Sequence, residues 1–132
     1  MNKPAFGLLV ALMISAAGCK SKLNSSLVLN GAPFVPTQCN SGQPQGFSGV
    51  DLIDATGTKL RLQTVPTGQA MVFVFPGGSP VGAPVAMCGT LAVERQNSQI
   101  NNVYNVRGNA TLPSCSNGAM TVSGTIQFEN CH

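Results

Sequence analysis

Residues 49–65, GVDLIDATGTKLRLQTV, are the stretch that decides the fold class. In its second half Leu60 and Leu62 alternate with charged or amide residues, which is the pattern of a strand with one buried and one solvated face. Gly57 can supply the positive φ angle that a tight turn between two strands requires. The stretch therefore predicts a β-hairpin with arms at 49–53 and 58–65.

Short strand patterns continue on both sides of this hairpin. Residues 71–75 are apolar throughout, which is typical of a central strand covered by a second sheet. Residues 120–129 alternate again, with an apolar face made of Met120, Val122, Ile126 and Phe128. Seven or eight such segments, separated by turn residues, predict an all-β fold. We expect a small two-sheet sandwich of antiparallel strands that resembles immunoglobulin-like domains, and a small β-barrel is the alternative.

The first eighteen residues have the pattern of a secretory leader. Lys3 precedes an uncharged run from Ala5 to Gly18, which as a helix would be about 21 Å long and so too short for a hydrocarbon core of about 30 Å. The run ends in Ser15-Ala16-Ala17-Gly18-Cys19, with Ala16 where leucine is usual. This ending resembles the lipobox of bacterial lipoproteins, and the resemblance implies cleavage before Cys19 and transfer of a diacylglyceryl group to its thiol.

The same resemblance implies a domain organisation and a location. Residues 1–18 would be the signal peptide, and residues 19–26 the lipidated N-terminus and a polar tether. Two or three acyl chains, palmitate among them, hold a protein stably at a membrane surface. The absence of aspartate at Lys20 favours the outer membrane, facing the periplasm or the cell surface. Residues 27–132 would form a single disulfide-stabilised β domain, since a mature chain of 114 residues is long enough for one core.

Besides Cys19 the chain has four cysteines, Cys39, Cys88, Cys115 and Cys131, an even set typical of disulfides in an exported protein. A strand over residues 119–129 would place Cys115 and Cys131 at ends roughly 33 Å apart, whereas bonded cysteines need Cα atoms within about 7 Å. Two pairings stay open: Cys39–Cys115 with Cys88–Cys131, or Cys39–Cys131 with Cys88–Cys115. We favour the second because it ties the final residues to the start of the domain.

The sequence offers little for catalysis, metal binding or a cofactor, and we predict none of these. The one histidine, His132, is terminal, and there is no Cys-x-x-Cys pair and no Gly-x-Ser-x-Gly motif. Asp54 falls in the predicted turn, while Glu94 and Glu129 lie near strand ends on polar faces, so all three are expected to be solvated. Without the leader, six basic residues stand against four acidic ones, which does not favour a nucleic-acid partner.

Arg61, Arg95 and Arg107 would form an anion-binding patch only if neighbouring strands brought them together, and we expect isolated surface arginines instead. Tyr104, the lone tyrosine, is expected to pack rather than to recognise a ligand. Residues 77–84, rich in glycine and proline, predict a connection between strands.

We therefore expect a lipid-anchored, non-enzymatic module of the cell envelope that binds another envelope protein or a glycan, or that has a structural role. The alternative is a small envelope enzyme or a protease inhibitor. An inhibitor would present an exposed rigid loop beside a disulfide, and residues 36–44, around Cys39, are the candidate.

Overall fold

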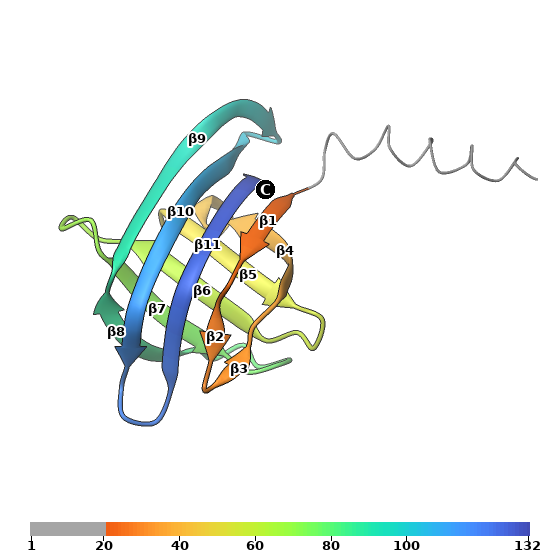
Figure 1. The fold of residues 1–132 in the computed structure, drawn as a ribbon. Helices are drawn as coiled ribbons and strands as arrows, with labels where there is room; N and C mark the ends of the chain where they lie inside the picture. The colour runs from red at the N-terminus through yellow and green to blue at the C-terminus, as the bar shows by residue number, and fades with distance from the viewer. Residues whose placement is uncertain (1–20) are drawn as a thin grey trace, which may run out of the picture.

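The computed structural model describes residues 21–132, except for the side chains of residues 98–100, so the predicted leader and Cys19 lie outside the described residues. Two antiparallel sheets, one of six strands and one of five, pack face to face, and their strands cross at a wide angle (Figure 1). The predicted all-β, two-sheet sandwich is confirmed. Along the chain the elements are β1 (Lys22–Ser25), β2 (Val28–Leu29), β3 (Ala32–Pro33), β4 (Pro36–Ser41), the short 3-10 helix η1 (Gln43–Gln45), β5 (Gly49–Asp54), β6 (Lys59–Thr64), β7 (Ala70–Phe75), β8 (Ala83–Cys88), β9 (Thr90–Ile100), β10 (Val103–Ser116) and β11 (Thr121–Cys131).

The strand order is mostly a meander. The five-stranded sheet runs β4-β5-β6-β7-β8, and in the other sheet β9, β10 and β11 are again consecutive neighbours. β1 and β2 then pair with β11, so the start of the described chain lies beside its end (Figure 1). Immunoglobulin domains use Greek-key connections instead. The likeness to them therefore extends to the two-layer packing and not to the order of the strands.

The hairpin predicted around residues 49–65 is present as β5 and β6. Leu60 and Leu62 are both fully buried, and Gly57 has a φ of 88° in the turn. The Asp54 carboxylate accepts hydrogen bonds from the backbone amides of Thr56 at 2.9 Å and Thr58 at 3.0 Å. These bonds satisfy turn amides that have no strand partner, which explains why an aspartate starts this turn.

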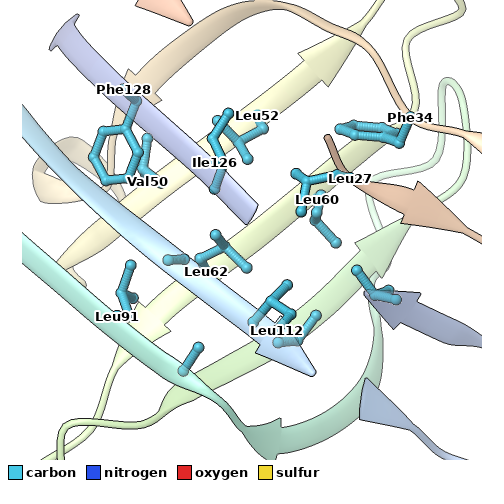
Figure 2. Close-up of a cluster of buried hydrophobic side chains, with 14 of the residues drawn as sticks. Leu27, Phe34, Val50, Leu52, Leu60, Leu62, Leu91, Leu112, Ile126 and Phe128 are labelled. Carbon is cyan, nitrogen blue, oxygen red and sulfur yellow. The ribbon is translucent and has the colours of Figure 1, made fainter. Parts of the chain in front are cut away.

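The core lies between the two sheets, where apolar side chains from both inner faces meet (Figure 2). Each fully buried leucine or isoleucine contributes roughly 1.5–3 kcal/mol to the free energy of folding by leaving water. The larger members labelled in Figure 2 are Val50, Leu52, Leu60 and Leu62 from the five-stranded sheet, Leu91, Leu112, Ile126 and Phe128 from the six-stranded sheet, and Leu27 and Phe34 from the N-terminal segment.

The predicted tether over residues 19–26 is wrong for its second half, because Lys22–Ser25 form β1. This strand pairs with β11 in the register Lys22 with Glu129 and Ser25 with Ile126. Its only large apolar side chain, Leu23, packs partly against the core. Pairing with the edge of the long β11 supplies the backbone hydrogen bonds of β1, so a segment with almost no apolar pattern is still a strand.

Finer features of the strands differ from what the sequence suggests. The polar residues Gln96-Asn97-Ser98 have the composition of a turn but lie inside β9, and the chain turns instead at Asn101 and Asn102, which have φ angles of 53° and 67°. The alternating apolar residues between positions 85 and 93 suggest one strand, but it is divided at Gly89, where the chain passes from one sheet to the other. β7 has its Val72 side buried, but the Met71 side is only partly covered, so one face of this strand lacks a second sheet.

Two disulfides join the two sheets to each other. Cys39 of β4 is bonded to Cys131 of β11, and Cys88 of β8 is bonded to Cys115 of β10, with Cα–Cα distances of 5.1 and 5.9 Å. This is the pairing favoured from the sequence. β4 and β8 are the outer strands of the five-stranded sheet. Both edges of that sheet are therefore covalently attached to the six-stranded sheet.

Candidate functional site

A pocket of about 360 Å³ opens at the end of the sandwich where β1 begins. Val106 pairs with Arg95 on one side and with Cys131 on the other, and the Ser21 hydroxyl donates to the backbone carbonyl of Asn130 at 3.2 Å. These contacts place the pocket and the first described residues at the same end. The lining residues that matter most are Ser41, Gln43, Phe47, Val93, Arg95 and Val106.

One wall of the pocket is the segment of residues 42–48, which joins β4 to β5 and contains η1. The amide of Gly42 donates to the carbonyl of Gly49 at 3.0 Å, and the amide of Phe47 donates to the carbonyl of Gly42 at 3.2 Å. The buried Ser41 hydroxyl accepts from the amide of Gln43 at 3.2 Å. Because these bonds form within the segment and with the residues on either side of it, the segment has a defined shape despite its glycines and proline.

The Gln43 side chain joins this segment to the opposite wall. Its Nε2 donates to the carbonyl of Asn102 at 3.0 Å, and its Oε1 accepts from the amide of Tyr104 at 3.1 Å. Both partners belong to the β9–β10 hairpin, about sixty residues further along the chain. One amide side chain therefore bridges the two walls.

Arg95 is the charged residue of the pocket lining, and its guanidinium carbon lies 5.0 Å from the centre of the Tyr104 ring. A guanidinium over an aromatic face is attracted by the negative charge density of the ring. Among the side chains that the structure describes, no carboxylate lies within ion-pair distance of Arg95. The positive charge of Arg95 is therefore not neutralised within the described part of the domain.

The other two arginines are both paired with carboxylates. Arg61 binds Asp51 on the outer face of the five-stranded sheet, with Nε–Oδ1 and Nη2–Oδ2 distances of 2.8 and 3.0 Å. Arg107 binds Glu94 through an Nε–Oε1 contact of 2.7 Å on the six-stranded sheet. The hydrogen bond and the charge of Glu94 raise the pKa of Arg107 above its usual value. In each pair the two charges neutralise each other, which leaves little positive charge to attract an anionic ligand.

The three arginines do not form one patch. Arg95 pairs in register with Val106, so the next residue on β10, Arg107, directs its side chain to the opposite face of the sheet. Arg61 lies on the other sheet. The expectation of separate arginines agrees with this arrangement, but it missed that Arg95 lines a pocket. Tyr104, expected to pack, does so against Arg95.

Residues 36–44, proposed as an inhibitor loop, are mostly a strand. Pro36–Ser41 form β4, and Cys39 is only 3% exposed. Thr37, Gln38 and Asn40 are exposed along this strand, and only residues 42–44 of the stretch lie outside it. In the same region Cys131 is held in a disulfide, and within residues 21–132 no three His, Cys, Asp or Glu side chains are grouped as metal ligands would be.

No family model matches this chain. Curated proteins and solved structures likewise show no significant similarity to it. In the range 21–132 there is no helix with the length and hydropathy that crossing a bilayer requires. Its function is therefore inferred from its own residues and their geometry.

Sequence reasoning did not find Gln43 or Phe47. They lie in a stretch, Gly42-Gln43-Pro44-Gln45-Gly46-Phe47, whose composition is that of an ordinary loop. The one signal was a large aromatic residue in an otherwise small and polar segment. Phe47 belongs to the pocket lining, and the centre of its ring lies 4.5 Å from the Arg61 guanidinium carbon.

Proposed function

We propose that this chain is a bacterial lipoprotein whose β-sandwich is a non-enzymatic binding module, held at a membrane surface of the cell envelope by lipid on Cys19. The observation that carries the proposal is the lipobox-like sequence Ser15-Ala16-Ala17-Gly18-Cys19 together with a strand that begins at Lys22. Only Lys20 and Ser21 separate the acylated residue from the folded domain. The outer membrane is the membrane we favour.

This short connection sets where the domain would sit. Three Cα–Cα steps span at most about 11 Å, so lipid on Cys19 would keep the start of β1 close to the headgroups. The pocket lies at that same end, because Val106 of its lining pairs with Cys131 beside the start of β1. We therefore expect the pocket end of the sandwich to lie near the membrane and the β10–β11 turn to point away from it.

Binding rather than catalysis is supported by how the carboxylates are used. Asp51 is paired with Arg61, Asp54 holds the β5–β6 turn, and Glu94 is paired with Arg107. None of them lines the pocket, whose described lining has one cation, Arg95, beside neutral polar and apolar residues. Such a lining can hold a ligand but offers no pair of groups for general acid and base catalysis. The partner we propose is an envelope protein, a glycan or another surface component.

The test of the anchor is metabolic labelling with an alkyne analogue of palmitate in a bacterial host, followed by the intact mass of the purified protein. We expect label and a mature chain beginning at Cys19, with both lost in Cys19→Ser. The matched control is Lys20→Gln, which leaves the cysteine and the small residues before it in place and should be labelled normally. A wild-type chain that begins at Cys19 without acyl mass, in the soluble fraction, would refute the anchor.

A further inference from the structure

We propose that the pocket lined by Arg95 binds a small organic anion, namely a carboxylate or phosphate monoester attached to a compact apolar group. The proposal names the ligand class for the binding role proposed above and rests on that role, but it does not depend on lipidation of Cys19. Its basis is a cation without a carboxylate partner among the described side chains, set in a pocket whose lining combines the apolar Phe47, Val93 and Val106 with the polar Ser41, Gln43 and Ser48.

Arg95 supplies the recognition of charge. A guanidinium presents its N–H donors in a planar fork that matches a carboxylate or a phosphate with two parallel hydrogen bonds. At Arg61 such a fork is already occupied by Asp51. At Arg95 the Tyr104 ring lies 5.0 Å from the guanidinium carbon, and no carboxylate of the described side chains pairs with the guanidinium, so its fork of N–H donors is left for a ligand.

The remaining walls favour an apolar body on the anion. Phe47, Val93 and Val106 line the pocket, while the hydroxyl-bearing Ser41 and Ser48 add polar groups beside them. A volume of about 360 Å³ falls in the range typical of small-molecule sites. Inorganic phosphate would leave the apolar walls unfilled, whereas a long acyl chain would exceed the space.

The walls are also fixed in advance of binding. Gln43 bridges residues 42–48 to the β9–β10 hairpin. Ser41 follows Cys39 by two residues, and Cys39 is bonded to Cys131 at the end of β11. A pocket with ordered walls loses less conformational entropy when a ligand binds. The geometry therefore favours a ligand that enters a preformed site.

Such an anion could come from two sources, a soluble metabolite or the phosphate of a membrane lipid. Both offer the same chemistry to Arg95, an oxyanion joined to an apolar group. The position of the pocket near the start of β1 makes the lipid source relevant.

The experiment is a titration of the full chain carrying Cys19→Ser, so that its outcome is separate from that of the lipidation test. The probe is butyl phosphate, with 1-butanol as the neutral analogue. Because the chain has one tyrosine and no tryptophan, intrinsic fluorescence reports on Tyr104 itself. We expect saturable change with butyl phosphate and none with butanol at equal concentration.

Three variants assign the effect to the guanidinium. Arg95→Gln should weaken binding at least about tenfold, as expected for loss of charge-assisted hydrogen bonds. Arg95→Lys keeps the charge without the fork and should bind with intermediate affinity. Arg107→Gln, the matched control, removes a cation from the opposite face of the sheet and should bind like wild type.

Vesicles of phosphatidylcholine with or without phosphatidic acid then distinguish a soluble metabolite from a membrane lipid as the source of the anion. Only a lipid ligand gives vesicle binding that depends on Arg95.

Three results would overturn the proposal. The first is the absence of a saturable fluorescence change in a folded wild-type chain. The second is equal binding of butyl phosphate and butanol, and the third is an Arg95→Gln variant that binds butyl phosphate with the affinity of wild type. Equal affinity of Arg95→Lys and wild type for butyl phosphate would reject the bidentate hydrogen bonding of the guanidinium to the anion. Circular dichroism of each variant checks that it retains the β fold.

Discussion

Arg61 and Asp51 face each other across β5 and β6 and make two parallel hydrogen bonds on what is formally the outer face of the five-stranded sheet. Asp51 is nevertheless only 4% exposed. The rings of Phe47 and Phe75 lie 4.5 and 4.8 Å from the Arg61 guanidinium carbon and shield the pair from water. Because it is shielded from water, this salt bridge should contribute more to the free energy of unfolding than an exposed pair does.

Asp51→Asn removes the carboxylate charge but keeps the shape of the side chain. We expect the free energy of unfolding to fall by about 2 kcal/mol, because the partly buried Arg61 loses its counter-charge. Urea denaturation followed by circular dichroism measures this change. Glu94→Gln is the matched control for the exposed Arg107–Glu94 pair and should lower the free energy of unfolding much less, because solvent screens the exposed charges. Equal losses in the two variants would contradict the difference in burial.

The two disulfides should differ in their contribution to stability. Residues 39 and 131 are separated by 92 positions, and residues 88 and 115 by 27. In the chain-entropy model these loops correspond to about 4.6 and 3.6 kcal/mol. We expect the double variant Cys39→Ala with Cys131→Ala to lose about 1 kcal/mol more than Cys88→Ala with Cys115→Ala. Non-reducing peptide mapping of the wild-type chain should recover the same two pairs, and any other pairing would reject this arrangement.

Gly124→Ala tests how closely the N-terminal segment approaches β11. Gly124 has a φ of 112°, and an added Cβ would overlap the backbone carbonyl of Ser26. We expect a loss of about 3 kcal/mol in the free energy of unfolding, or failure to fold. Gly118→Ala is the control: its φ is 93°, but no atom lies within 4 Å of the added Cβ. It should cost only the backbone strain of about 1 kcal/mol, and a similar loss at both positions would argue against the close approach.

Gln43→Ala removes the bridge between the two walls of the pocket. We expect faster hydrogen exchange of the Tyr104 amide, which donates to Gln43 Oε1 at 3.1 Å, with a loss in global stability below about 1.5 kcal/mol. Gln45→Ala, also in η1, is the matched control, since its side chain makes no hydrogen bond to the described residues. Unchanged exchange at Tyr104 in Gln43→Ala would show that the bridge is not formed in solution.

Strong alternation made part of the fold predictable. β5 and β6 were predicted because Leu60 and Leu62 stand between polar residues, and β11 because Val122, Ile126 and Phe128 repeat with the strand period. β1 was not predicted, because its hydrogen bonds come from β11, a hundred residues away, and its own side chains carry little pattern. Local periodicity cannot report such a distant pairing.

The pocket was harder to predict than the fold for a related reason. Gln43 and Phe47 lie in one segment and Arg95 about fifty residues further along the chain, and they meet only because the two sheets are stacked. In the sequence, Arg95 is indistinguishable from Arg61 and Arg107, which have carboxylate partners across a strand pair. What distinguishes Arg95 is its neighbour Tyr104 on β10, and the register between β9 and β10 determines that contact.

The bond between Cys39 and Cys131 also governs how the domain would respond to mechanical load. Residues 40–130, which include β5 to β10 and nearly all of β11, lie inside one covalent ring closed by this bond. Tension between the two ends of the described chain can detach β1, β2 and β3, which releases at most roughly 60 Å of extended backbone. The ring then carries the force through its disulfide, and the remaining strands bear none of it. A protein tethered by its N-terminus would thus have a short N-terminal segment that can extend by a limited length, followed by a domain that stays folded under the load.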